Sequence, residues 1–324
     1  MKKILFRADA KPSIGTGDLI SLIALSEYLD DFECFFLTQS TSAAKKIIER
    51  RNQKNVFWLD ENADVKVDVA TINEIVDSHK IDMLFFEITE RKLTEYKGLK
   101  SEIPKVCVNF DGFVPDDIKV VINWDAAAAK YYDVGRFPNT KFLLGPKYVI
   151  LPKPFYADEI KARTYTPQRK KILIAMGGAD ELDFTSKVAS AVARVDRELV
   201  IIVGAGYENE QSLKNTLDSK GAKYKIKTNV TDMLSEYLAC DFAVGAGGLT
   251  SSELVASRTP CALIATYEHQ IARCEYFDTE GWARYLGFRS CDDRLLNMDI
   301  SQFNPKFSEN IFDIKGLVDA VRKV

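Results

Sequence analysis

Short apolar runs alternate with segments of helical periodicity almost from one end of the chain to the other. Short apolar runs are typical of buried strands, and apolar positions spaced by three or four residues are typical of helices that cover a sheet. The runs predict strands at 4–7, 32–37, 56–59, 83–86, 105–110, 119–122, 171–175, 198–203, 242–245 and 261–264. The periodic segments predict helices at 19–29, 43–51, 70–79, 184–194, 210–219, 233–239, 251–257, 272–280 and 314–324. This β-then-α alternation predicts an α/β fold whose parallel sheets are covered by helices on both faces.

Prolines and charged residues between positions 146 and 170 interrupt the alternation and predict a connector between two domains. We expect residues 1–150 to form an N-terminal Rossmann-like domain and residues 168–310 to form a second one. The last segment, 311–324, is expected to be an amphipathic helix that can cross back to the first domain. Two such domains would present the carboxyl ends of their sheets to a central cleft, where parallel sheets bind ligands.

Composition and charge exclude several classes of partner. The 324 residues are 46% apolar and 28% charged with a net charge of -3, so no overall positive field attracts nucleic acid. No apolar stretch approaches the roughly 20 residues of a membrane-spanning helix, and we expect no integral membrane contact. Six cysteines without a CxxC pair predict reduced core thiols and a cytoplasmic protein. With only two histidines and no clustered acids beside the glycine loops described next, we expect neither a metal nor another cofactor.

The first glycine loop, Ile14-Gly15-Thr16-Gly17-Asp18, follows the first predicted strand and precedes a helix. Gly15 and Gly17 let the backbone turn sharply, and the helix N-terminus that follows offers unpaired N–H groups to an anion. Asp18 falls at about the N-cap of this helix. It is either a capping residue, worth about 1 kcal/mol, or a catalytic carboxylate, and the loop alone does not separate these alternatives.

A second glycine loop, Met176-Gly177-Gly178-Ala179-Asp180, follows the predicted strand at 171–175. The turn is expected to open a helix and to hold a diphosphate on its backbone N–H groups, with Gly177 and Gly178 in the nucleotide site. The loop lacks the lysine of a Walker P-loop, so ATP hydrolysis is not indicated. An ordinary strand-to-helix turn is the alternative.

The third loop is the most informative, because small residues and hydroxyls gather at the start of a predicted helix. It runs Gly247-Gly248-Leu249-Thr250-Ser251-Ser252-Glu253. Such a helix N-terminus suits phosphate oxygens, and Glu253, one turn inside, can accept both hydroxyls of a ribose. Alternatively, the serines cap the helix and Glu253 is a first-turn partner of its dipole. Glycine at three of the four positions 245–248 is more costly than capping requires, so we favour a ligand site.

A fourth loop, Thr266-Tyr267-Glu268-His269-Gln270, follows the predicted strand at 261–264. An imidazole and an amide at the carboxyl edge of a sheet are well placed to contact sugar hydroxyls, so His269 and Gln270 are predicted substrate-binding residues. An ordinary surface or capping histidine is the alternative. In the first domain, the predicted substrate-binding residues are Gly15, Thr16 and Gly17.

These loops, in this order, resemble the GT-B architecture of nucleotide-sugar enzymes. More closely, the chain resembles the UDP-sugar hydrolases of the pseudaminic-acid pathway and the related spore-coat polysaccharide proteins. The likeness runs through most of the chain and includes Phe-Arg-Ala-Asp at 6–9, the four loops above, Leu-Gly-Pro-Lys-Tyr-Val-Ile-Leu at 144–151 and Gly281. The run at 145–151 is the most specific, because generic GT-B enzymes do not share it.

The resemblance implies a uridine nucleotide in the second domain, with Glu253 on the ribose and residues 248–252 on the diphosphate. It also implies attack of water on the anomeric carbon with inversion, within bacterial nonulosonic-acid or surface-glycan biosynthesis. The chain has diverged from the family at the catalytic base: Asp18 stands where the family has histidine, and Ser21 where it has arginine. Thr89 takes the place of a tyrosine expected to position water. A carboxylate can serve as such a base, as it does in inverting glycosidases.

Three functions stay open on these grounds. The first is an enzyme that hydrolyses a UDP-type nucleotide sugar, with Asp18 and Thr89 as catalytic residues. The second is an inverting GT-B glycosyltransferase that passes the same sugar to a saccharide or lipid acceptor. The third is a non-catalytic protein that binds a nucleotide sugar. Asp18→Asn separates the enzymes from the binding protein, because only an enzyme would lose turnover and keep its affinity for UDP.

Overall fold

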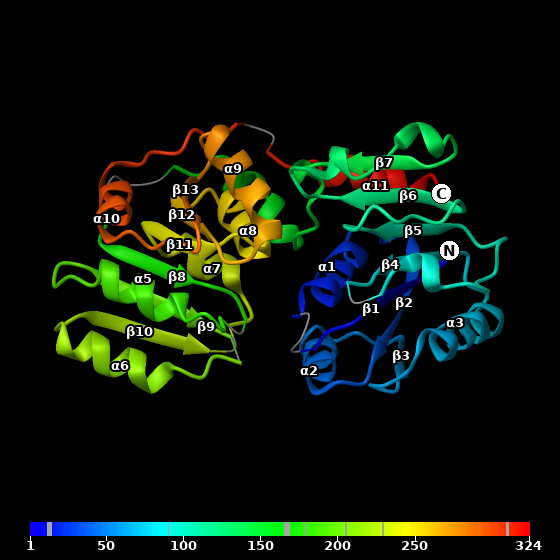
Figure 1. Ribbon diagram of the computed structural model, residues 1–324. Helices are drawn as coiled ribbons and strands as arrows, with labels where there is room; N and C mark the ends of the chain where they lie inside the picture. The colour runs from blue at the N-terminus through cyan, green and yellow to red at the C-terminus, as the bar shows by residue number, and fades with distance from the viewer. Residues whose placement is uncertain are drawn as a thin grey trace. The chain divides into compact units, whose positions relative to one another are not determined.

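The computed structural model describes residues 1–11, 15–89, 91–164, 169–178, 180–204, 206–228, 230–308 and 311–324. The chain divides into two compact units (Figure 1). The first comprises Met1–Lys153 with Phe312–Val324, and the second comprises Pro154–Ile311. Each unit has its own parallel sheet and its own apolar core, so each is described by itself.

The first unit is built on a seven-stranded parallel sheet with the order β3-β2-β1-β4-β5-β6-β7. Its strands are β1 (Lys2–Ala8), β2 (Phe32–Gln39), β3 (Val56–Leu59), β4 (Met83–Glu87), β5 (Lys105–Val108), β6 (Ile118–Asn123) and β7 (Lys141–Leu144). Its α-helices are α1 (Gly17–Ser26), α2 (Ser42–Arg50), α3 (Val65–His79) and α11 (Ile314–Arg322). Alternate strand residues point to opposite faces, so Phe86 packs in one core with Ile72 of α3, while Phe85 contacts Phe6 on the other face.

The C-terminal helix α11 belongs to the first unit. The Asp313 carboxylate caps it by accepting from the Gly316 amide at 2.8 Å. Near its other end, Arg322 donates to Asp30 and Asp31 in the turn between α1 and β2. Because both aspartates are exposed, the buried face of α11, which includes Leu317, contributes most of its attachment.

The second unit is built on a six-stranded parallel sheet with the order β10-β9-β8-β11-β12-β13. Its strands are β8 (Lys171–Ala175), β9 (Glu198–Val203), β10 (Lys223–Thr228), β11 (Phe242–Ala246), β12 (Cys261–Ala265) and β13 (Arg284–Phe288). Its α-helices are α4 (Asp158–Lys161), α5 (Phe184–Val192), α6 (Glu210–Ser219), α7 (Met233–Leu238), α8 (Leu249–Ala256), α9 (Ile271–Thr279) and α10 (Asp293–Gln302). Short 3₁₀ helices occur in both units at η1 (Leu93–Glu95), η2 (Ala128–Lys130), η3 (Val134–Arg136), η4 (Pro146–Tyr148), η5 (Lys153–Tyr156) and η6 (Glu268–Gln270).

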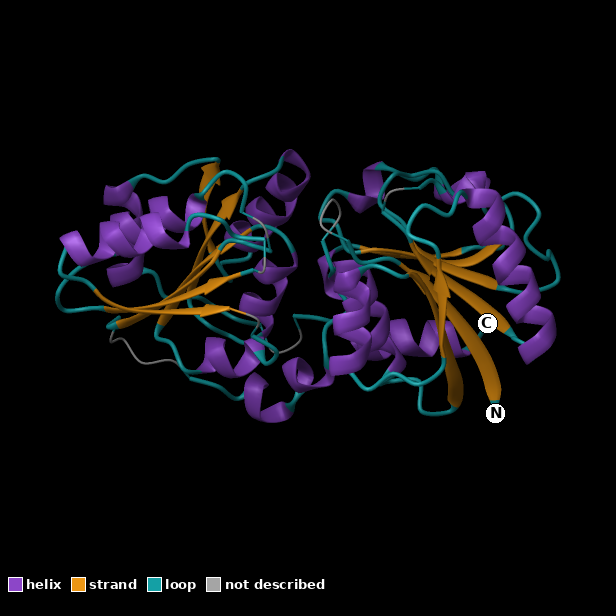
Figure 2. Ribbon diagram, turned by 90° about the horizontal axis from the view of Figure 1, so that it is seen from below, coloured by secondary structure: helices purple, strands orange, loops and turns teal. Residues whose placement is uncertain are grey.

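Both sheets have the Rossmann order, in which the first strand is central and the chain moves outward first on one side and then on the other. Helices cover both faces of each sheet (Figure 2). This confirms the prediction of two parallel α/β sheets. The order reverses between β1 and β4 in the first unit and between β8 and β11 in the second. Parallel sheets bind ligands beyond the carboxyl ends of their strands at such switch points, so the loops after β1 and β4 are the candidate binding loops of the first unit, and those after β8 and β11 are the candidate binding loops of the second.

The proline-rich stretch predicted as a connector is packed rather than free. Val149, Ile150 and Leu151 are fully buried in the first unit, and Phe155 is buried in the second. The reason is that the stretch also contains apolar side chains, which pack into the unit to which they belong. No helix in the ranges described above combines the length and the apolar character that a bilayer crossing requires.

Candidate active site

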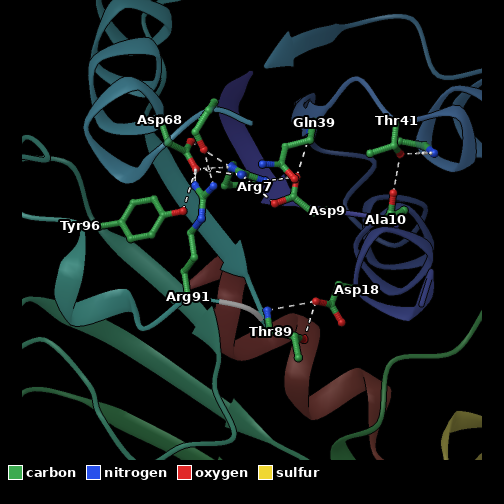
Figure 3. Close-up of polar contacts among 12 residues, drawn as sticks. Arg7, Asp9, Ala10, Asp18, Gln39, Thr41, Asp68, Thr89, Arg91 and Tyr96 are labelled. Carbon is green, nitrogen blue, oxygen red and sulfur yellow. Dashed lines mark hydrogen bonds and ion pairs between the residues drawn. The ribbon is translucent and has the colours of Figure 1, made fainter. Parts of the chain in front are cut away.

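In the first unit, Asp18 lies in the first turn of α1, where its carboxylate bonds to another loop. The N-cap of α1 is Thr16, not Asp18 as the sequence suggested, and no side chain caps this helix end. Instead, Asp18 Oδ2 accepts a hydrogen bond from the Thr89 backbone N–H at 3.2 Å and another from Thr89 Oγ1 at 2.6 Å (Figure 3). Asp18 follows β1 and Thr89 follows β4, so this contact spans the switch point of the first sheet.

The surroundings of Asp18 make it a suitable base. Burial raises its pKa to about 6, and the two hydrogen bonds from Thr89 act in the opposite direction. The nearby charge of Asp9 raises this pKa further. A carboxylate with a pKa of about 6 is ionised at pH 7 and is a stronger base than an ordinary aspartate. Thr89 donates both of its bonds to Oδ2, and the backbone N–H of Asp18 also lowers the pKa of this carboxylate.

The loop before Asp18 is closed by backbone hydrogen bonds. Gly15 N–H donates to the Lys11 carbonyl at 2.8 Å, and Lys11 N–H donates to the Gly15 carbonyl at 3.1 Å. The chain turns back at Gly15 with a φ of +81°, which a residue with a Cβ rarely adopts. Gly15 and Thr16 are exposed, and Gly17 is the first residue of α1. Ile14 lies outside the described residues.

A buried ion network fixes the start of this loop. The Arg7 guanidinium donates to both oxygens of Asp9, at 2.7 and 2.8 Å, and to Asp68 of α3 at 2.9 Å (Figure 3). Tyr96 donates to Asp68 at 2.7 Å, and the Gln39 N–H donates to Asp9 at 2.9 Å. These charge-assisted bonds hold the residue that follows β1, so the loop bearing Asp18 begins from a rigid point.

The structure also brings Glu87, which the sequence analysis missed, next to Asp18. Glu87 is the last residue of β4 and is 2% exposed. Its Oε2 shares a hydrogen bond with Ser21 Oγ of α1. Burial and the charge of Asp18 raise the pKa of Glu87 well above its usual value. The available signal in the sequence was an acidic residue that directly follows the apolar run 83–86.

Thr89→Val is expected to shift the acidic limb of the pH–rate profile to higher pH. Thr89 Oγ1 stabilises the ionised form of Asp18, so its loss raises the pKa of Asp18 above about 6 and leaves less base at pH 6. The rate at pH 6 should fall about three- to tenfold, with little change at pH 8, where Asp18 is ionised in both proteins. Thr89→Ser keeps the hydroxyl and should keep the wild-type midpoint. A midpoint that moved to lower pH in Thr89→Val would contradict this.

In the second unit, the loop after β8 does not open a helix directly. Helix α5 begins at Phe184, and acidic side chains already occupy its N-terminal N–H groups. Asp180 accepts from the amides of Phe184 and Thr185 at 3.0 and 2.6 Å, and Asp183 accepts from the amide of Ser186 at 3.3 Å. These three N–H groups are therefore already bonded within the chain, and a diphosphate on the loop of Gly177 and Gly178 stays a prediction. Gly177 and Gly178 are exposed in the loop itself, and Ala179 lies outside the described residues.

Helix α8, which follows β11, has no such cap. Its N-cap is Gly248, and its first turn contains no acidic residue. Gly247 brings the loop against the start of α9: a Cβ at this position would lie 2.5 Å from Cys274 Sγ and 2.9 Å from Gln270 Cβ. Only glycine fits such an approach. The result is an uncapped helix N-terminus beside the switch point of the second sheet, with its positive dipole end open to an anion.

The serines of α8 do not face this opening. Ser251 and Ser252 are buried, and Ser251 Oγ donates to the Gly248 carbonyl at 2.7 Å. Their side chains are therefore not the exposed donors of this helix start, and a diphosphate on residues 248–252 stays a prediction. The half-buried residues Leu249 and Thr250 begin the helix, so backbone N–H groups are the donors available there.

Glu253 is half-buried one turn inside α8, and Tyr237 of α7 orients it. The Tyr237 hydroxyl donates to Glu253 Oε2 at 2.7 Å. Tyr237 is fully buried, and burial together with the charge of Glu253 raises its pKa well above the usual value, so the phenol stays a donor. Sequence analysis missed Tyr237, because sixteen residues separate it from Glu253 and no local motif links them.

The two polar residues of the fourth loop are placed differently. Gln270 is buried, and its Oε1 accepts from the Thr266 amide at 2.9 Å and from the Thr266 hydroxyl at 3.1 Å. A Cβ added at Gly248 would lie 3.5 Å from Gln270 Nε2, so the side-chain amide lies next to this glycine. His269 is exposed, and its ring stacks on that of Tyr267 with centroids 5.8 Å apart. The structure thus brings Gln270 against the glycine loop, and the role of His269 stays a prediction.

No protein-family model matches the chain. The spore coat polysaccharide biosynthesis protein SpsG of Bacillus subtilis (strain 168) is 28% identical over 223 residues, which is 65% of this chain and 64% of SpsG. The uncharacterized protein MJ1062 of Methanocaldococcus jannaschii is 26% identical over 292 residues, which is 85% of this chain and 58% of that protein. The chain thus spans less than two thirds of the length of either relative.

Solved structures with the same fold include MurG of Acinetobacter baumannii and the UDP-GlcNAc 2-epimerase of Methanocaldococcus jannaschii. MurG has a TM-score of 0.63 at 14% identity, with 100% of both chains covered. The epimerase has a TM-score of 0.64 at 12% identity, with 99% of both chains covered. At these identities the likeness establishes the fold, which is GT-B with two Rossmann-like domains, as predicted.

Proposed function

We propose that the chain binds a UDP-type nucleotide sugar through its second unit and transfers the sugar from the nucleotide to water, with Asp18 as general base. The observation that carries this proposal is the Asp18 carboxylate itself, held by Thr89 at the switch point of the first sheet with a pKa raised to about 6. A carboxylate that only capped its helix would bond to the amides of α1.

In the proposed reaction, a water molecule attacks the anomeric carbon and gives its proton to the Asp18 carboxylate. The bond between the anomeric carbon and the diphosphate oxygen breaks, and its electron pair leaves with UDP. Attack from the face opposite the leaving group inverts the anomeric centre. The uncapped N–H groups of α8 stabilise the charge on the diphosphate, and Glu253 accepts hydrogen bonds from the ribose.

The relatives support the same class of substrate. SpsG is described as a spore coat polysaccharide biosynthesis protein, and the epimerase of the same fold is described as acting on UDP-GlcNAc. A role in bacterial nonulosonic-acid or other surface-glycan biosynthesis is the part of the proposal that follows from the sequence resemblance.

The proposal is tested in two steps. Thermal unfolding is measured with equal concentrations of UDP, GDP, CMP and dTDP. A ligand that binds the native state raises Tm by an amount that grows with the logarithm of its concentration over its Kd, so UDP should give the largest increase. The protein is then incubated with UDP-sugars, and free sugar and UDP are quantified. Stabilisation by UDP without release of free sugar in water would exclude the hydrolase.

A glycosyltransferase is the second candidate, and exposed aromatic side chains favour it. Phe113 and Tyr131, in the loops after β5 and β6, are 53% and 47% exposed at the same carboxyl edge as Asp18. Aromatic rings present a large rigid apolar face at which a sugar ring can pack. If the chain is a transferase, added saccharide acceptors should increase UDP release and should themselves gain the sugar.

Tyr237→Phe is expected to weaken UDP binding about five- to tenfold. The variant keeps the ring and loses only the hydroxyl that orients Glu253, so the ribose contact is loosened while the core stays filled. Titration calorimetry with UDP measures the change. Tyr224→Phe, which removes a surface hydroxyl bound to Asp218 in the same unit, is the matched control and should leave the Kd unchanged. Equal Kd values for wild type and Tyr237→Phe would remove Glu253 from the ribose site.

A further inference from the structure

Glu87 is a buried acid, and no residue that the structure describes on its side of the first sheet supplies a cation for it. Its side chain shares a face with Phe85, because alternate strand residues share a face, and α1 covers this face with Ser21. Arg7 points to the opposite face, where it bonds to Asp68 of α3. The sheet therefore separates Glu87 from the guanidinium nearest to it in the strand register.

The charged groups around Glu87 do not favour its ionised form. Asp9 and Asp68 are also buried, but both pair with Arg7. Of the residues that follow β4, Arg91 bonds to Asp68 and Lys92 lies over the Phe113 ring. On the neighbouring strand β5, Glu87 is in register with the uncharged Val108. Asp18 is the ionisable group that α1 presents to Glu87, and its charge is negative. An ionised Glu87 would be desolvated beside a like charge.

The hydrogen bonds of Ser21 indicate where the proton is. Ser21 Oγ contacts Glu87 Oε2 and also lies 3.0 Å from the backbone carbonyl of Asp18. A serine hydroxyl has one proton, and a carbonyl oxygen can only accept. Both contacts are hydrogen bonds when the Glu87 carboxyl donates to Ser21 Oγ and Ser21 donates to the Asp18 carbonyl. With an ionised Glu87, one of the two contacts would join two acceptors.

We propose that Glu87 stays protonated at neutral pH and acts as a positioning residue that holds the first turn of α1, and with it Asp18, through Ser21. A neutral acid supplies this hydrogen bond without adding a second negative charge beside the base. At alkaline pH, ionisation of Glu87 would turn the Ser21 hydroxyl away from the Asp18 carbonyl and disturb the base. The protonation of Glu87 is independent of the proposed function, whereas its effect on Asp18 as a base rests on it.

Thermal unfolding at pH 5 and pH 8 tests the protonation. The unfolded chain ionises Glu87 near its ordinary pKa and the folded chain only at higher pH, so Glu87 makes the native state less stable as pH rises between these values. Glu87→Gln mimics the neutral acid and removes this loss. Its Tm should exceed that of wild type by at least about 7 °C at pH 8 and by only about 2 to 4 °C at pH 5, where less of the unfolded chain's Glu87 is ionised.

Asp68→Asn is the matched control, because Asp68 is as deeply buried on the opposite face but pairs with Arg7. It should lower Tm at both pH values, since it leaves a buried guanidinium with one carboxylate fewer. If Glu87→Gln lowered Tm at pH 8 as Asp68→Asn does, Glu87 would be ionised in the native state and the proposal would be overturned.

The pH–rate profile tests the positioning role. Glu87→Gln should keep kcat within about threefold at pH 7 and should lose the alkaline decline of the wild type, whereas Ser21→Ala should lower kcat at all pH values. A tenfold loss of kcat in Glu87→Gln at pH 7, together with the expected Tm values, would overturn the positioning role alone. Absence of turnover in the wild type would instead count against the proposed function and leave the Tm result standing.

Discussion

Asparagine at position 18 is expected to lower the turnover of a nucleotide sugar by about 10²- to 10⁴-fold and to leave the Kd for UDP unchanged. The amide oxygen of asparagine can still accept the two hydrogen bonds from Thr89, so the geometry of the loop is kept while the base is lost. The nucleotide is proposed to bind in the other unit, which the substitution does not touch. UDP release measures kcat, and titration calorimetry measures the Kd.

The pH dependence provides an internal check on this result. Wild-type kcat should fall about tenfold per pH unit below about pH 6, because protonation of Asp18 removes the base, and Asp18→Asn should lack this limb. Asp64→Asn is the control: Asp64 also lies at the start of a helix, but its carboxylate caps α3 by accepting from Val67 N–H. Asparagine caps almost as well, so this variant should keep full activity. Unchanged turnover in Asp18→Asn would mean that another group is the base.

The central strands could be predicted from the sequence because they are buried on both faces. The predicted bounds of β8 and β9 match the structure, and helix α6 begins and ends where its periodicity indicated. The bounds of the edge strand β3 also match, because all four of its residues are apolar although only one is fully buried. Strands β7, β10 and β13 were missed. Each is an edge strand of its sheet, and each carries exposed residues. Their charged and half-exposed residues, such as those of Lys223–Thr228, interrupt the apolar run by which a buried strand is recognised.

In the candidate site too, features with a local sequence signal could be predicted, and contacts between distant residues could not. Glycine loops are local signals, so the loops at Gly15, Gly177 and Gly247 were found, and each does follow a central strand. Thr89, which bonds to Asp18, was named only through the family resemblance. Glu87 and Tyr237 were not found, because their partners Ser21 and Glu253 lie far from them in the sequence. The burial of the serines of α8 could not be predicted either, because composition places hydroxyls at a helix start, but only the rotation of the helix against the sheet decides which of them face solvent.

Gly248→Asp is expected to raise the Kd for UDP at least about 100-fold without lowering the stability of the protein. Aspartate side chains cap α3, α5, α7 and α11, whereas α8 begins at a residue without a side chain. A carboxylate at this N-cap would bond to the same N–H groups that we propose for the diphosphate and would repel its charge. The backbone tolerates the change, because φ at Gly248 is -77° and a Cβ would lie 3.5 Å from Gln270 Nε2.

Two further substitutions at Gly248 separate charge from size. Gly248→Ala adds only a methyl group in ordinary van der Waals contact and should change the Kd less than about threefold. Gly248→Asn can cap the helix without a charge and should fall between the alanine and aspartate variants, at about tenfold. Tm should be equal to or above wild type in the aspartate variant, since a cap contributes about 1 kcal/mol.

If Gly248→Asp bound UDP as tightly as wild type, the diphosphate would not lie on α8. The nucleotide would then have to be held by other groups of the second unit, since the N-terminus of α5 is already occupied by Asp180 and Asp183.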